Sequence, residues 1–127
     1  MNDTTTVNRT IFLVDDDAAV CHSLSVLLNG SGYDVMSFLS AEAFLDEADS
    51  LMQGVILLDQ CMNGMTGLEL QTELSRRGHT FPVIFITANI DEQIHAEAIQ
   101  HGALNILKKP FSNDVLLECI NKTLSNK

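Results

Sequence analysis

The sequence repeats one alternation five times: a short apolar run, a loop, and then a segment with helical periodicity. The apolar runs cover residues 11–14, 33–38, 55–58, 83–86 and 104–107. Three of them are apolar on consecutive residues, which is typical of strands buried on both faces of a parallel sheet. Strands and helices that alternate in this order predict an α/β fold.

The helical segments have recognisable beginnings and ends. After the first apolar run, Val20, Leu24 and Leu28 repeat at the spacing of an amphipathic helix, which the Asn-Gly-Ser-Gly cluster at 29–32 would stop. Asp17 is expected to cap this helix, and Ser40 is expected to cap a second helix over residues 41–48.

The later helices are marked in the same way. Residues 68–77 and 92–101 are each followed by a glycine, and Ser112 is placed to cap the last helix. In that last helix we expect one apolar stripe, made of Val115, Leu116, Cys119, Ile120 and Leu124.

Five strand–helix units in 127 residues fit one domain, residues 1–127, with residues 1–8 as a flexible N-terminal tail. A (βα)₈ barrel would need roughly twice this length. The predicted fold is therefore a flavodoxin-like, doubly wound (βα)₅ sandwich with a parallel five-stranded sheet in the order 2-1-3-4-5.

Charge and composition exclude several classes of protein. Seventeen acidic and seven basic residues give a net charge of −10, and no Lys or Arg lies between Thr10 and Ser75, so direct nucleic-acid contact is not expected. The apolar runs are too short to cross a bilayer, and the N-terminus lacks the pattern of a signal peptide. Cys21, Cys61 and Cys119 show no metal-binding spacing, so we expect free thiols in a cytoplasmic protein.

Polar side chains follow the predicted strands at the points where they end. Asp15 and Asp16 follow the first strand, Asp59 the third and Thr87 the fourth, and Lys109 lies just beyond the fifth. In an open parallel sheet, ligands bind beyond the carboxyl ends of the strands at the switch point of the strand order. We therefore expect these side chains to surround one crevice.

The chemistry of this set favours a cation and a phosphoryl group. Asp15, Asp16 and Asp59 would repel one another by roughly 3 kcal/mol per pair at about 5 Å, and Mg²⁺ would relieve that repulsion. Lys109 and Thr87 add a positive charge and a hydroxyl on the far side, which outlines a pocket for a dianionic tetrahedral group. An aspartate placed here can act as a nucleophile that takes a phosphoryl group.

These residues resemble the receiver domain of two-component response regulators. The matching segments are 14–17 (Val-Asp-Asp-Asp), Leu58-Asp59 with Met62 and Gly67 following, 86–88 (Ile-Thr-Ala), and 109–111 (Lys-Pro-Phe). The resemblance covers residues 10–124, and the segment 40–45 (Ser-Ala-Glu-Ala-Phe-Leu) is similar to the FixJ-like branch, whose receivers precede a helix-turn-helix output domain.

The resemblance implies roles for individual residues. Asp59 would be the phosphoacceptor, and Thr87 and Lys109 would hold the phosphoryl oxygens. Asp16, Asp59 and the backbone carbonyl of Cys61 would bind Mg²⁺ directly, and Asp15 would act mostly through a bound water. Ala88 would leave room for the phosphoryl group, and Cys61 and Asn89 would tune its lifetime.

Three positions depart from the family pattern. Asn63 replaces the usual proline in the loop after the acceptor and, with Gly64, predicts a looser turn. Ile106 stands where a Tyr or Phe is usual, so the switch is expected to rely on Thr87 and on loop motion. Lys108 is an extra charge, and the binding role is assigned to Lys109 because it directly precedes Pro110.

The expected function is that of a phosphoacceptor, not a turnover enzyme, which a sensor histidine kinase phosphorylates. The phosphorylated domain would switch its fourth helix, fifth strand and fifth helix, through a homodimer or an output domain that regulates transcription. Two alternatives are a haloacid-dehalogenase-like Mg²⁺ phosphatase, which also uses an aspartate nucleophile, and a free-standing receiver that binds a partner protein. An FMN-binding flavodoxin is disfavoured because three aspartates after the first strand would repel phosphate.

Overall fold

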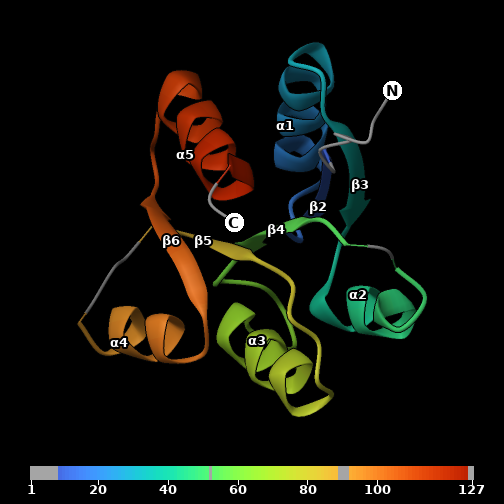
Figure 1. Cartoon of the computed structure of the whole chain (residues 1–127), viewed down its shortest axis with the longest axis vertical. Helices are drawn as coiled ribbons and strands as arrows, with labels where there is room; N and C mark the ends of the chain where they lie inside the picture. The colour runs from blue at the N-terminus through green and yellow to red at the C-terminus, as the bar shows by residue number, and fades with distance from the viewer. Residues whose placement is uncertain (1–8, 52, 89–91, 126–127) are drawn as a thin grey trace.

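The strands form one parallel sheet in the computed structural model, which describes residues 9–51, 53–88 and 92–125 (Figure 1). The elements in chain order are β2 (Thr10–Val14), α1 (Ala18–Gly30), β3 (Asp34–Phe38), α2 (Ala41–Ala48), β4 (Val55–Asp59), α3 (Gly67–Arg76), β5 (Val83–Thr87), α4 (Glu92–Gln100), β6 (Ala103–Lys108) and α5 (Asn113–Ser125). The strand order is β3-β2-β4-β5-β6, which confirms the predicted order 2-1-3-4-5.

Helices cover both faces of this sheet. Figure 1 shows α1 and α5 over one face and α2, α3 and α4 over the other. Side chains alternate between the two cores: Phe12 and Val14 of β2 face one cluster, and Ile11 and Leu13 face the other. Consecutive apolar residues in β2, β4 and β5 are thus explained, because both faces of these strands are covered by helices.

One of the two cores contains a cluster of phenylalanines. The rings of Phe12, Phe38, Phe44 and Phe81 lie with centroids 5.1–6.4 Å apart, mostly edge to face. Such pairs add stability beyond the area that they bury. The cluster joins β2, β3, α2 and the segment before β5 into one packed layer.

The predicted helix caps are confirmed. Asp17 accepts hydrogen bonds from the N–H groups of Ala19 and Val20, at 3.0 and 3.3 Å. Ser40 accepts from the N–H of Ala43 at 3.0 Å, and Ser112 accepts from that of Val115 at 3.2 Å. These side chains satisfy N–H groups that a helix leaves unpaired at its first turn.

Other predicted boundaries differ by one or two residues. The helix predicted over 68–77 begins at Gly67, because Thr66 and Glu69 form a reciprocal capping box, and it ends at Arg76. The apolar runs at 55–58 and 83–86 continue as strands to Asp59 and Thr87, the residues at which the third and fourth strands were expected to end. Two predictions, the flexible tail over residues 1–8 and the role of Asn89, lie outside the described residues.

The predicted stripe of α5 is wrong at one position. Leu116, Cys119 and Ile120 are buried against the sheet, but Val115 is 46% exposed.

In the part of the chain that the structure describes, none of the helices has the length and apolar character needed to span a membrane.

Gly67 allows α3 to begin directly against the end of β4. A Cβ atom at this position would lie 2.7 Å from the carbonyl oxygen of Asp59 and 2.8 Å from the Phe85 ring. The backbone of Gln60 is also close, with its Cα at 3.1 Å. Because two of these contacts involve backbone atoms, a side chain at residue 67 would displace either α3 or the end of β4.

We predict that Gly67→Ala lowers the free energy of unfolding by about 1–3 kcal/mol, because the added methyl group overpacks this contact. Gly30→Ala is the matched control: nothing lies within 4 Å of a Cβ there, and alanine favours helix. Urea unfolding followed by circular dichroism measures both variants. Equal stabilities for the two would show that α3 moves away from β4 at no cost.

Candidate functional site

Three strands bring the predicted site residues to one edge of the sheet. Asp59 and Thr87 are the last residues of β4 and β5, and Asp15 directly follows β2. β2 and β4 are neighbours in register, with Val14 opposite Leu58, so Asp15 and Asp59 end up side by side. The crevice lies at the switch point of the strand order, as predicted.

The carboxylates of Asp15, Asp16 and Asp59 converge. One oxygen atom of each lies within 4.8 Å of those of the other two. Asp15 and Asp59 are buried, with 3% and 6% of their surfaces exposed, and Asp16 is half-buried. Three carboxylate oxygens are the kind of ligands that a small, hard cation such as Mg²⁺ prefers, so the residues present fit the predicted metal.

Lys109 supplies positive charge to this cluster. Its Nζ lies 3.6 Å from Oδ1 of Asp59 and 3.8 Å from Oδ2 of Asp15. Its backbone N–H donates to the carbonyl of Thr87 at 2.8 Å, which ties the loop after β6 to the end of β5. Lys108 is exposed at the end of β6, so the ammonium that enters the site is that of Lys109, as predicted.

Backbone N–H groups bind each of the three carboxylates. The N–H of Asp17 donates to Oδ1 of Asp15 at 3.0 Å, and that of Asn63 donates to Oδ2 of Asp16 at 2.9 Å. The carboxylate of Asp59 accepts a hydrogen bond from the backbone N–H of Cys61. These bonds to ionised acceptors fix the orientation of the carboxylates.

The acidity of Asp59 reflects its surroundings. Burial and the neighbouring Asp15 carboxylate together raise its pKa from 3.8 to about 6, against the opposing effects of Lys109 and the Cys61 backbone. Burial raises the pKa of the Cys21 thiol to about 11, and the nearby carboxylates, Asp15 foremost, act in the same direction to reach that value. Cys21 therefore stays protonated, and its Sγ donates to the carbonyl of Asp15 at 3.3 Å.

The loop between β4 and α3 is held by side chains from elsewhere in the chain. Oε2 of Glu42, in the first turn of α2, accepts from the N–H of Met65 at 3.1 Å. Gly64 adopts a positive φ of 79° between Asn63 and Met65. The looser turn predicted at Asn63 is thus pinned on both sides of Gly64, through bonds to Asp16 and Glu42.

Sequence reasoning missed three of these contacts. The Asn63–Asp16 and Met65–Glu42 bonds use backbone N–H groups, which carry no signal of their own in a sequence. The Cys21 thiol bond depends on how α1 packs at the end of β2.

The structure places the two remaining predicted residues differently. Thr87 is buried at the site, with 1% of its surface exposed. Cys61 is exposed, and the role of its backbone carbonyl as a metal ligand stays a prediction.

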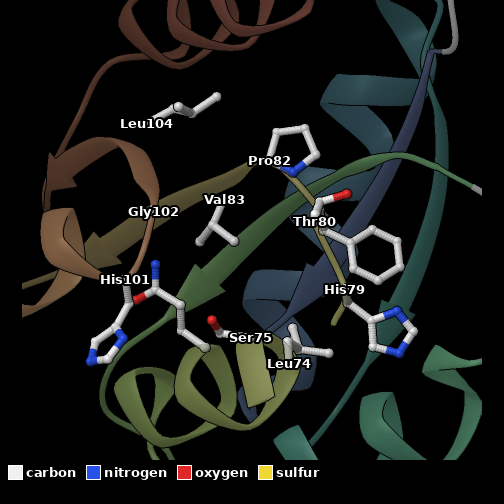
Figure 2. Close-up of a pocket in the computed structure, with 11 residues that line it drawn as sticks. Leu74, Ser75, His79, Thr80, Pro82, Val83, His101, Gly102 and Leu104 are labelled. Atoms are coloured by element: carbon white, nitrogen blue, oxygen red, sulfur yellow. The ribbon is translucent and has the colours of Figure 1, made fainter. Parts of the chain in front are cut away.

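A separate cavity of about 380 Å³ lies at the opposite end of the strands (Figure 2). Val83, the first residue of β5, lines it, and Figure 2 shows His79 and His101 on different sides of it. None of the predicted site residues lines this cavity. The concave region and the carboxylate crevice are therefore two distinct features of the fold.

We predict that Asp59→Asn stabilises the metal-free protein above pH 6. Folded Asp59 keeps its proton up to pH about 6, whereas an unfolded aspartate loses it near pH 3.8, so the folded state binds more protons in between. The stability that Asp59 contributes therefore falls as the pH rises through this window. The variant should be about 1–3 kcal/mol more stable at pH 7.5 in EDTA, with a smaller gain at pH 4.5.

Urea unfolding at both pH values measures this difference. Asp46→Asn, which changes an exposed carboxylate on α2, is the control and should show no comparable pH-dependent gain. A lower free energy of unfolding for Asp59→Asn at pH 7.5 would mean that the ionised Asp59 carboxylate stabilises the folded state, contrary to this prediction.

Comparisons with known proteins agree with this geometry. Residues 11–121 match the response regulator receiver domain family. The transcriptional regulatory protein TdiR of Thauera aromatica is 44% identical over 116 residues, which are 91% of this chain and 51% of TdiR. The transcriptional regulatory protein FixJ of Bradyrhizobium diazoefficiens is 36% identical over 114 residues, 90% of this chain and 56% of FixJ. The chain thus spans about half the length of these relatives.

Solved structures show the same fold. The crystal structure of FixJ-N superposes with a TM-score of 0.86 at 34% identity, and covers 100% of this chain and 98% of that one. The response regulator StyR gives a TM-score of 0.84 at 38% identity, over 91% of this chain and 59% of StyR. Together with the aspartate cluster and the lysine at the strand ends, these matches show that the chain belongs to the receiver domain family of two-component response regulators.

Proposed function

We propose that this domain accepts a phosphoryl group on Asp59 from the phosphohistidine of a sensor histidine kinase, with Mg²⁺ as the cofactor. The observation that carries the proposal is the position of Asp59, between a cluster of carboxylates and the Lys109 ammonium at the end of a buried strand. Asp59 is fixed by the strand, so its carboxylate oxygen can be held in line with an incoming phosphorus atom.

In the proposed transfer, a carboxylate oxygen of Asp59 forms a bond to phosphorus while the P–N bond to the kinase histidine breaks. The electron pair of that bond stays on the imidazole nitrogen, which leaves as neutral histidine. Mg²⁺ held by Asp15, Asp16, Asp59 and the carbonyl of Cys61 would neutralise charge on the phosphoryl oxygens. Lys109 and Thr87 would bind the remaining oxygens from the other side.

An apolar cleft beside the crevice offers a surface for the kinase. It has a volume of about 430 Å³ and is lined by α1, by the end of β5 and by the loop after β6. Asp15 and Lys109 line both the cleft and the site. A helix that carries the phosphohistidine and packs against Val20, Leu24 and Phe111 would place its histidine next to Asp59.

We predict that acetyl phosphate or a phosphorylated kinase adds one phosphoryl group to the chain in the presence of Mg²⁺, and that Asp59→Asn and EDTA each abolish the addition. Intact-mass spectrometry measures the added group. Asp17→Asn is the matched control, because it changes a neighbouring carboxylate but keeps an acceptor for the helix cap. Undiminished phosphorylation of Asp59→Asn would place the acceptor elsewhere.

The relatives are response regulators, which are signalling proteins rather than turnover enzymes. We propose that here, too, a single phosphorylation acts as a signal, followed by slow loss of the group. TdiR and FixJ are transcriptional regulatory proteins about twice as long as the matched region, so the proposed readout is an output domain that binds DNA. With its net charge of −10, the receiver itself is not suited to contact DNA.

The proposed switch surface consists of α4, β6 and α5. Its exposed apolar side chains, Ile99, Leu104 and Val115, are 46–52% exposed and come from all three elements. Phosphorylation adds close to two negative charges beside Thr87 and Lys109, and drawing these groups inward would alter the neighbouring β6. Ile106 lacks an aromatic ring and is half-buried against the core, which favours a smaller rearrangement.

We predict that beryllofluoride, a mimic of the aspartyl phosphate, strengthens self-association by about 1–3 kcal/mol. Leu104→Glu should abolish this increase because it puts a charge on the exposed apolar surface of β6. Val26→Glu, at an exposed apolar residue of α1, is the control and should leave it intact. Sedimentation velocity measures the association, and equal inhibition by both variants would exclude α4, β6 and α5 as the interface.

A further inference from the structure

We infer that the backbone N–H of Asn63 is a positioning group for the metal site, which holds the Asp16 carboxylate where a cation can use it. The inference rests on the proposed Mg²⁺ site and adds a determinant of its affinity. It concerns the backbone of Asn63, since the side chain of this residue is exposed and the bond to Asp16 uses the main chain.

Asp16 differs from the other two carboxylates in how it is held. Asp15 and Asp59 are buried and both lie near the Lys109 ammonium. Asp16 is half-buried in the loop after β2, and within the described parts of the chain the Asn63 N–H is its single hydrogen-bond or ion-pair partner, at 2.9 Å. One peptide N–H therefore opposes the repulsion that Asp16 experiences from two neighbouring carboxylates.

Without this bond, the cheapest response of Asp16 is to rotate toward solvent. Its carboxylate has an oxygen within 4.8 Å of those of Asp15 and Asp59, and no cation of the chain lies beside it in the described residues. The N–H occupies one lone pair of Oδ2, and an ionised carboxylate keeps further lone pairs on its two oxygens for a metal ion. The same bond can thus persist when a cation binds, so that it prepares the site instead of competing for it.

The donor is itself fixed in place. Two residues later the N–H of Met65 is held by Glu42 of α2, with Gly64 at a positive φ between them. At the other end of the loop, the N–H of Gly67 donates to the carbonyl of Gln60 at 3.2 Å. The loop is therefore anchored on both sides of Asn63, and its N–H is aimed at Asp16 before any metal arrives.

Asn63→Pro and Asn63→Ala separate the backbone from the side chain. Proline has no N–H to donate, whereas alanine keeps it. Mg²⁺ affinity is measured by isothermal titration calorimetry with the whole chain. Asn63→Ala should bind Mg²⁺ like the unchanged protein, and Asn63→Pro should bind about tenfold more weakly, as expected for the loss of one hydrogen bond to a charged group. Equal affinities for the two variants would overturn the inference.

A double-mutant cycle in EDTA tests the same bond without a metal. Asn63→Pro should lower the urea midpoint in the unchanged protein and have little effect in the Asp16→Ala background, where the acceptor is gone. An equal drop in both backgrounds would mean that proline merely strains the loop, and would overturn the inference. If the unchanged protein binds no Mg²⁺, the proposed cofactor fails, while this cycle still decides whether Asn63 holds Asp16.

Hydrogen exchange covers the case in which Asn63→Pro does not fold. The backbone N–H of Asn63 should exchange slowly in the unchanged protein, and its exchange should be tenfold or more faster in Asp16→Ala. The Met65 amide, which bonds to Glu42 instead, is the internal control and should change much less. Equal exchange of the Asn63 amide in both proteins would show that the bond does not form in solution.

Discussion

The mutual repulsion of Asp15, Asp16 and Asp59 is the constraint on which the rest of this site depends. At about 5 Å, each pair of charges costs roughly 3 kcal/mol at an effective dielectric near 20. Of the three carboxylates, Lys109 forms ion pairs with Asp15 and Asp59, at 3.8 and 3.6 Å, so one ammonium faces a cluster with three negative charges. The arrangement is stable because the sheet beneath it leaves Asp15 and Asp59 no alternative position.

That rigidity comes from the apolar core. All five residues of β4 and of β5 are buried, and helices cover both faces of the sheet, so neither strand can shift without exposing apolar surface (Figure 1). Gly67 lets α3 pack directly against the carbonyl of Asp59 at the end of β4. Stability gained along the strands thus offsets the unfavourable charge at their ends, as is common at functional sites.

The sheet and the convergence of Asp15, Asp59 and Thr87 could be predicted because consecutive apolar residues identify buried parallel strands, whose carboxyl ends share one edge. Helix caps such as Ser40 were also predictable, since their signal is local. Val115 was not, because periodicity defines an apolar face but not whether another element covers it. The Asn63–Asp16 bond could not be predicted for a different reason, since its donor is a backbone N–H, which every residue except proline possesses.

The hydrogen bonds at the site also determine which elements respond to a change at Asp59. The N–H of Gln60 donates to the carbonyl of Ile86 at 3.1 Å, and its side chain accepts from the N–H of Leu68 in the first turn of α3 at 2.8 Å. Through Met65 and Glu42 the same loop reaches α2. A displacement at the end of β4 is therefore shared among β5, α3 and α2. Because Ile106 has no aromatic ring, these hydrogen bonds connect Asp59 to the rest of the domain alongside the proposed movement of Thr87 and Lys109.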